Sequence, residues 1–367
     1  MKTPFRPNSI TLQWHVTERC NWRCKHCYQE FYSTPEMKLG DLFRVRDQFL
    51  GLLDSFDPPV ERARINVTGG EPFARRDILE LLAGIAKYNR RWSWSLLSNG
   101  SFLDKELAKY LKGLGISQYQ VSMEGMEETN DEIRSKGAFR QTIRAIELLR
   151  EAGIPTLVSL TLSRKNKNEV FALAKFLAPL GVRALGARRI VPWGQGEKMR
   201  EHLMEPEELY EFYRSIEDMN VWMIRRGYPL RVMGGCESGF FYDRVRRHPE
   251  TKEYLMNKGW CGVKEGRILT VLPDGAVLPC RRLPIPVGKL FAQTLSEIYR
   301  SPAMQAFRAF ETEPALAACR RCENWSNCAG GALCVNYGFT RRWNAPDVQC
   351  KRIFHSLEEA ARVSAAV

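Results

Sequence analysis

Three closely spaced cysteines near the start of the chain have the clearest chemical potential. Cys20, Cys24 and Cys27 form the pattern C-x3-C-x2-C. Three thiolates on one tight loop can bind three irons of a cubane, whereas a 4Fe–4S cluster normally has four cysteine ligands. One iron would therefore remain open to an external ligand. The alternatives for this triad are a zinc loop and buried free thiols.

A second short segment combines glycines with a carboxylate. Gly69, Gly70 and Glu71 stand between Thr68 and Pro72. Glycine lets the backbone come close to a ligand, and a carboxylate beside an ammonium group makes a charge-assisted hydrogen bond. This segment is therefore a candidate binding loop for an amine. The structural alternative is that Glu71 only caps a helix.

Eight further cysteines follow, most of them near the C-terminus. The N-terminus carries no secretory signal, so we expect a reducing, cytoplasmic location in which disulfides are disfavoured. Clustered cysteines then indicate metal or redox chemistry. A zinc ribbon is the alternative, although the segment has one C-x2-C pair rather than two. The eight are Cys236, Cys261, Cys280, Cys319, Cys322, Cys328, Cys334 and Cys350.

Short β-rich runs alternate with longer amphipathic stretches from residue 10 to about 190, which predicts an α/β fold with a parallel sheet. The predicted helices include Asp77–Tyr88, Asp104–Leu114, Phe139–Ala152 and Glu169–Leu180. The cysteine triad and three polar joints follow strands, and the carboxyl ends of parallel strands gather ligand groups in one site. The predicted strands are Ile10–Val16, Arg64–Thr68, Trp92–Leu97, Gln118–Ser122, Thr156–Thr161 and Val182–Ile190.

The alternation stops after Trp193, which predicts three parts of the chain. Residues 1–195 form the α/β domain, residues 196–258 form a bridge with a long helix at Pro206–Arg226, and residues 259–367 form a cysteine-rich domain. A hairpin is predicted at Ile268–Leu278, where Pro273-Asp274-Gly275 signals the turn. With little core of its own, the last domain would depend on bound metal.

The cysteine triad after the first strand and Gly-Gly-Glu-Pro after the second resemble the radical S-adenosylmethionine (SAM) superfamily. The resemblance implies a partial (β/α)6 TIM-type barrel and a 4Fe–4S cluster on Cys20, Cys24 and Cys27. In that family SAM chelates the open iron and is cleaved reductively to a 5′-deoxyadenosyl radical. The resemblance assigns the SAM amino group to Gly69, Gly70 and Glu71, the ribose hydroxyls to Ser122 and Glu124, and the methionine carboxylate to Arg134.

The order of the C-terminal cysteines is similar to the SPASM extension of many radical SAM enzymes. The family usually has x3 where this chain has x5, between Cys328 and Cys334. The resemblance implies two auxiliary 4Fe–4S clusters. Cys236 completes the inner one if all eleven cysteines are ligands. The outer cluster is assigned Cys319, Cys322, Cys328 and Cys350, and the inner one Cys261, Cys280 and Cys334.

Enzymes of the SPASM type most often act on peptides or proteins, so the main prediction is crosslinking, thioether formation or related C–H functionalisation of a ribosomally made precursor. Sulfatase maturases usually carry Asp after the cysteine that matches Cys280; Arg281 stands there, which disfavours formylglycine formation. The expected partners are the precursor, a separate leader-binding protein or leader contact at Arg244–His248, and flavodoxin or ferredoxin as electron donor. No catalytic base or hydrogen donor is assigned.

Two alternative functions remain. A radical SAM decarboxylase of the haem pathway has a similar architecture, and Arg281 and Arg282 would suit propionates. A zinc-containing nucleic-acid-binding protein would use the net charge of +13. That charge is spread along the chain rather than packed into one tract, so we expect no nucleic-acid partner. No run of 18 apolar residues is present, so we also expect no membrane partner.

Overall fold

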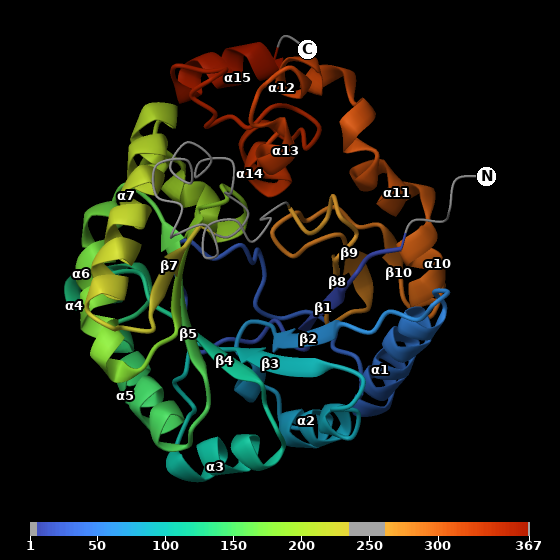
Figure 1. Cartoon of the computed structure of the whole chain (residues 1–367). Helices are drawn as coiled ribbons and strands as arrows, with labels where there is room; N and C mark the ends of the chain where they lie inside the picture. The colour runs from blue at the N-terminus through green and yellow to red at the C-terminus, as the bar shows by residue number, and fades with distance from the viewer. Residues whose placement is uncertain (1–5, 235–260, 366–367) are drawn as a thin grey trace.

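The computed structural model describes residues 6–234 and 261–365. Seven strands follow one another in sheet order, each parallel to the next, with helices between most of them (Figure 1). The strands are β1 (Ile10–His15), β2 (Ala63–Thr68), β3 (Ser93–Leu97), β4 (Gln118–Ser122), β5 (Thr156–Leu162), β6 (Ala184–Arg189) and β7 (Arg231–Met233). The six predicted strands are confirmed, with ends within two residues of those predicted.

The helices form an outer ring around the curved sheet (Figure 1). They are α1 (Leu39–Asp54), α2 (Ile78–Ala86), α3 (Lys105–Gly113), α4 (Glu127–Ile133), α5 (Ala138–Glu151), α6 (Val170–Leu177) and α7 (Pro206–Arg225). α1 is not among the helices predicted above, although its buried residues, Leu42, Val45, Phe49 and Leu52, have helical spacing. No helix of the described ranges is long and apolar enough to cross a membrane.

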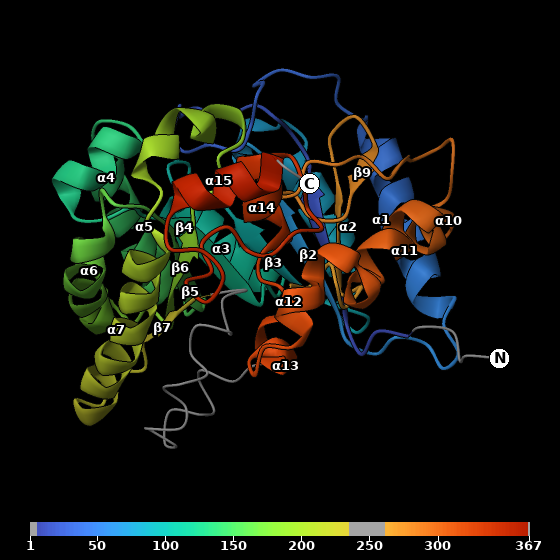
Figure 2. The ribbon, with the colours of Figure 1, turned by 90° about the horizontal axis from the view of Figure 1, so that it is seen from above.

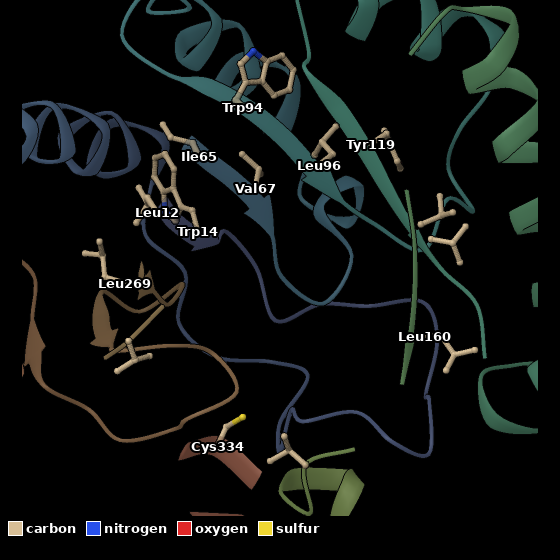
Figure 3. Close-up of a cluster of buried hydrophobic side chains, with 14 of the residues drawn as sticks. Leu12, Trp14, Ile65, Val67, Trp94, Leu96, Tyr119, Leu160, Leu269 and Cys334 are labelled. Carbon is tan, nitrogen blue, oxygen red and sulfur yellow. The ribbon is translucent and has the colours of Figure 1, made fainter. Parts of the chain in front are cut away.

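The outer face of the sheet is apolar. The parallel register aligns Leu12 with Ile65 and Ile65 with Trp94, and all three side chains are fully buried. Figure 3 shows this cluster, which also contains Trp14, Val67, Leu96, Tyr119 and Leu160. Full burial of one such side chain stabilises the fold by about 1.5–3 kcal/mol. The main core therefore lies between the sheet and the helical ring.

The inner face of the same strands is mostly polar, with Leu97 and Leu157 as apolar members. Gln13 aligns with Asn66 and Asn66 with Ser95, whose hydroxyl lies 2.6 Å from the Asn66 side-chain oxygen. Further along the sheet, Ser122 aligns with Ser159. A closed TIM barrel fills its interior mainly with Val, Ile and Leu. Here most of these inner side chains are partly exposed, so the barrel is open on the inside.

The C-terminal segment continues the sheet at its other edge. β8 (Ile268–Val271) pairs with β1 in parallel, while β9 (Ala276–Leu278) and β10 (Gly288–Lys289) add antiparallel strands. The predicted hairpin is confirmed, and its parallel pairing with β1 is a feature that the local sequence pattern does not predict. Within the described ranges the sheet thus has ten strands, from β10 at one edge to β7 at the other.

Short helices complete the ring between the two sheet edges (Figures 1 and 2). Their attachment to the barrel includes a buried ion pair. The two terminal nitrogens of Arg189, on β6, lie 2.8 and 2.7 Å from the Asp347 carboxylate. The Gln349 amide also donates to the Met204 carbonyl at 2.7 Å. These helices are α10 (Leu295–Arg300), α11 (Pro302–Arg308), α12 (Ala317–Arg320), α13 (Trp325–Cys328), α14 (Leu333–Thr340) and α15 (Leu357–Ala365).

Candidate functional site

The three N-terminal cysteines lie together in the loop that follows β1. The Cys27 amide donates to the Cys24 carbonyl at 3.2 Å, which folds this loop tightly. Burial raises the pKa of Cys24 to about 12, although the Arg134 guanidinium, 3.7 Å from its sulfur, acts in the opposite direction. The charges of Cys27 and Cys20 raise the same pKa further, as expected of neighbouring thiols. A bound metal would deprotonate these thiols.

The glycine loop after β2 is fastened to the cysteine loop. The Gly70 amide donates to the Thr17 carbonyl at 2.9 Å, and the Glu71 amide donates to the Arg19 carbonyl at 2.8 Å. A Cβ atom at Gly69 would lie 2.4 Å from the Thr17 carbonyl oxygen, and one at Gly70 would lie 2.3 Å from that of Arg19. Only glycine fits such an approach. These glycines therefore set the position of the cysteine loop.

The Glu71 side chain points into the protein. Its carboxylate accepts hydrogen bonds from the Ser98 hydroxyl at 2.9 Å, from the Asn99 amide at 2.8 Å and from the Phe73 amide at 3.2 Å. The last contact caps the short 3-10 helix Pro72–Ala74, as the structural alternative requires. The role of Glu71 towards the SAM amino group stays a prediction. Burial raises the pKa of Glu71 to about 7, although its hydrogen bonds act in the opposite direction. An ammonium group nearby would lower that pKa.

Glu124, two residues beyond β4, positions Arg134. Its buried carboxylate binds Arg134 and also accepts from the Thr161 amide at 2.6 Å, while the His26 Nε2 atom lies 3.3 Å away. Burial lowers the pKa of His26 to about 4, so this ring is neutral near pH 7. Both oxygens of the Glu124 carboxylate already have protein donors. Its contact with a ribose hydroxyl stays a prediction. Ser122 is partly exposed at the same strand end.

These residues fit the cofactors that the sequence implies. Arg134 is buried beside Cys24, and its Nε atom has no hydrogen-bond partner among the described residues. A ligand carboxylate would suit this guanidinium. The three thiols, the glycine cradle and Arg134 thus surround one region at the carboxyl ends of the strands, where parallel α/β folds bind ligands.

Four of the C-terminal cysteines share one cavity. Cys319, Cys322, Cys328 and Cys350 line a space of about 320 Å³. Burial, followed by the charges of Cys350 and Cys322, raises the pKa of Cys319 to about 12. The structure therefore brings together the four residues predicted for the outer cluster, although they come from separate segments. Their ligand role stays a prediction.

The two extra residues before Cys334 are accommodated by a left-handed turn. Ala329, Gly330 and Gly331 all have positive φ, at 51°, 83° and 82°. Buried Lys264 donates to the carbonyls of Ala329 and Gly331, which fastens this turn. The lengthened spacing is therefore absorbed in the loop without displacing Cys328 from the cavity.

The inner set is less complete in the structure. Cys334 is buried on α14, Cys280 follows β9, and Cys261 opens the described C-terminal segment. Cys236 lies outside the described residues, so its role as fourth ligand stays a prediction. Among the residues that the structure describes, no three His, Cys, Asp or Glu side chains are placed to bind a single metal ion.

A cluster near the inner set was not predicted from sequence. Tyr28 lies between His15 and Arg281: its ring centroid is 6.1 Å from that of His15 and 4.7 Å from the Arg281 guanidinium carbon. Burial is the largest cause that raises the pKa of Tyr28, and negative charge on Cys27 and on Cys280 raises it further. The cluster therefore lies between the first cysteine loop and an expected inner ligand. One sequence signal could have indicated this cluster. Polar residues alternate with apolar ones along β1, at Thr11, Gln13 and His15, which places His15 on the inner face of the sheet.

Similarity to known proteins covers both cysteine-containing parts. The radical SAM superfamily model matches residues 14–177, and the model of the SPASM iron–sulfur cluster-binding domain matches residues 261–323. An AdoMet-dependent heme synthase of Oleidesulfovibrio alaskensis is 28% identical over 346 residues, 91% of this chain and 84% of that protein. A PqqA peptide cyclase of Gluconobacter oxydans is 28% identical over 366 residues, 95% of this chain and 92% of that protein.

A solved structure shares the fold. The chain matches tagged anSMEcpe with bound AdoMet at a TM-score of 0.75 and 17% identity, covering 98% of each chain. The matched domains also establish the cofactors as SAM and 4Fe–4S clusters. The cysteine loop after β1, its glycine cradle and the cysteine-lined C-terminal cavity lie within or next to the matched segments. The chain belongs to the radical SAM superfamily and carries a C-terminal SPASM domain.

Proposed function

We propose that this enzyme uses the 5′-deoxyadenosyl radical to modify a ribosomally made peptide or protein, by a crosslink, a thioether or a related C–H functionalisation. The observation that carries this proposal is the polar inner face of the open barrel. Gln13, Asn66 and Ser95 form one row across it, and Gln120, Ser122 and Ser159 lie further along the sheet.

A polar cavity suits a peptide better than a flat apolar macrocycle. Each peptide unit carries one N–H donor and one C=O acceptor, which need partners when they leave water. Partly exposed amide and hydroxyl side chains, such as those of Gln13, Asn66 and Ser122, can supply them. A relative named PqqA peptide cyclase, matched over nearly the whole chain, also supports a peptide substrate.

The residues would divide the work as follows. Cys20, Cys24 and Cys27 hold the cluster, which supplies the electron for SAM cleavage when bound. Arg134 orients the SAM carboxylate and is itself held by Glu124. Gly69 and Gly70 keep the cysteine loop in place, and Glu71 stiffens the neighbouring Ser98-Asn99 turn.

The C-terminal cysteines would bind two auxiliary clusters. Residues 1–195 would form the radical SAM domain, residues 196–258 the bridge and residues 259–367 the auxiliary domain. We expect flavodoxin or ferredoxin as electron donor. A separate leader-binding protein, or the segment Arg244–His248 outside the described residues, would bind the precursor.

A haem-pathway decarboxylase is the second candidate. It is favoured by the buried guanidinium of Arg281, which a propionate would suit, and by the relative named AdoMet-dependent heme synthase. Iron porphyrin carboxylates and peptides would need different cavities, and the polar inner face favours the peptide.

The two candidates differ in what stimulates SAM cleavage. The reconstituted enzyme, reduced with dithionite, is incubated with SAM and either the short peptides encoded beside its gene or iron coproporphyrin III. We expect a peptide to increase 5′-deoxyadenosine formation and to lose hydrogen, seen by mass spectrometry. Loss of carbon dioxide from the porphyrin, with no change in any peptide, would establish the second candidate instead.

A further inference from the structure

Arg281 is a buried cation. The residue is 7% exposed, it donates no hydrogen bond within the described ranges, and its Nε atom is fully enclosed there without a partner. The nearest carboxylate, that of Glu18, lies 3.7 Å from Nη2. A buried charge is costly unless hydrogen bonds compensate it. This guanidinium therefore has unused donors at a position where unused donors are unfavourable.

A second residue in the same place has the same property. His15 is fully buried, and both of its ring nitrogens lack a partner in the described structure. Tyr28 lies between the two, with its ring near His15 and under the Arg281 guanidinium. Unsatisfied buried polar groups are rare in native proteins. His15 is fully enclosed and does not line the neighbouring cavity, so the case for a ligand with acceptor atoms depends on Arg281.

Arg281 and Tyr28 line a cavity of about 210 Å³ between the cysteine loop and the C-terminal hairpin. Most of its other walls are apolar: Phe31, Trp193, Leu272, Leu278, Pro284 and Pro286. Apolar walls with few polar groups are typical of ligand sites, in which the polar groups determine orientation.

Among the described residues, the carboxylate nearest to the Arg281 guanidinium is that of Glu18, which at 3.7 Å lies beyond hydrogen-bond distance. Asp274, at the wall, is neutralised by Lys289 at 2.6 Å. The carboxylate of Glu18 is bound by the Gln29 amide. Glu30 also lines the cavity, with an exposed side chain.

We propose that Arg281, whose guanidinium lies over the Tyr28 ring, binds a carboxylate group of the substrate in this cavity. A guanidinium presents paired N–H donors that match the two oxygens of a carboxylate. The proposal rests on the proposed function in one respect: the substrate must enter the barrel beside the cysteine loop. It adds the group that is recognised, either an acidic peptide side chain or terminus, or a propionate.

Equilibrium binding tests this without turnover, so its outcome is independent of whether the bound molecule is modified. Hexaglutamate, hexaglutamine and iron coproporphyrin III are titrated calorimetrically into the reconstituted enzyme with SAM. Arg281→Gln and Arg281→Lys are compared with Arg144→Gln, an exposed arginine on α5. We expect a carboxylate probe to bind Arg281→Gln at least about tenfold more weakly than wild type, because a charged hydrogen-bonded pair is lost. Arg281→Lys should recover part of the affinity, and Arg144→Gln should match wild type.

Which carboxylate probe depends on Arg281 identifies the source: hexaglutamate indicates an acidic peptide, and the porphyrin indicates a propionate. Equal affinity of wild type and Arg281→Gln for both carboxylate probes would overturn the proposal. Hexaglutamine binding as tightly as hexaglutamate, together with porphyrin binding that does not depend on Arg281, would also overturn it. Wild-type enzyme provides a check that needs no variant: the carboxylate probe that binds should slow phenylglyoxal modification of Arg281, measured by peptide mass mapping. Unchanged modification would also overturn the proposal.

Discussion

Arg189→Met should loosen the C-terminal part from the barrel. Arg189 and Asp347 are 1% and 2% exposed, and their two contacts are 2.8 and 2.7 Å long. The variant leaves the Asp347 carboxylate buried, and in the described part of the chain its remaining donors are the Ala332 and Gln349 amides, each at 3.0 Å. Removing one partner of such a buried pair costs about 3–5 kcal/mol.

Hydrogen exchange measures this cost locally, which suits a chain too large for simple two-state unfolding. The amides of Ala332 and Gln349 should exchange at least about a hundredfold faster in Arg189→Met, at 1.4 kcal/mol per factor of ten. Arg188→Met is the matched control. The Arg188 side chain, next to Arg189 on β6, is exposed, so its replacement should change the free energy of unfolding by about 0.5 kcal/mol or less. If the Ala332 and Gln349 amides exchange at the same rate in Arg189→Met as in Arg188→Met, the Arg189–Asp347 pair does not hold the C-terminal part on the barrel.

The same pair predicts a pH dependence. Burial alone would raise the pKa of Asp347, but the Arg189 guanidinium and the backbone hydrogen bonds outweigh it and lower that pKa. The stability that Asp347 contributes is therefore present above its unfolded pKa and is lost as the pH falls through its folded pKa. Arg189→Met should show less of this acid loss than wild type.

Three further predictions concern the two cysteine sites. Because burial raises the pKa of Glu71 from 4.5 to about 7, its contribution to stability is present below about pH 4.5 and is lost as the pH rises through 7, by about 3 kcal/mol. Urea unfolding of Glu71→Gln between pH 5 and 8 should lack that loss of stability. A free energy of unfolding that falls with pH as steeply as in wild type would contradict this prediction. Gly70→Ala should displace the cysteine loop and remove about four irons per chain, whereas Gly51→Ala, with open space around its Cα, should keep them. Cys322→Ala should also lose about four irons but retain the spectroscopic signal of the SAM-binding cluster; loss of both signals would contradict separate sites.

The barrel half of the fold was predictable because its signals are local. Each of the six strands is a short β-rich run, and the cysteine triad and Gly69-Gly70 follow directly from the motifs. The pairing of β8 with β1 was not predictable, because it joins segments more than two hundred residues apart with no local signal. The site was predictable as a set of residues rather than as a geometry. Arg281 is visible in the sequence, but its burial over Tyr28 depends on that distant pairing.

The arrangement of Glu124 also depended on three-dimensional packing. The sequence places it after a strand end, but its contact with Arg134 and with the Thr161 amide of β5 requires neighbouring strands to meet. The lengthened loop before Cys334 shows the opposite case, because its turn depends on local sequence: Gly330 and Gly331 adopt positive φ, which glycine accommodates without strain.

We expect this chain to carry three cubane clusters and to cleave SAM through the first of them. The most direct measurement uses anaerobically reconstituted protein: iron and sulfide per chain, followed by dithionite reduction with SAM and an assay for 5′-deoxyadenosine. We expect about twelve irons per chain, using four per cluster, and SAM cleavage that disappears in Cys24→Ala. Zinc in place of iron, with no 5′-deoxyadenosine from the wild-type chain, would contradict the claim.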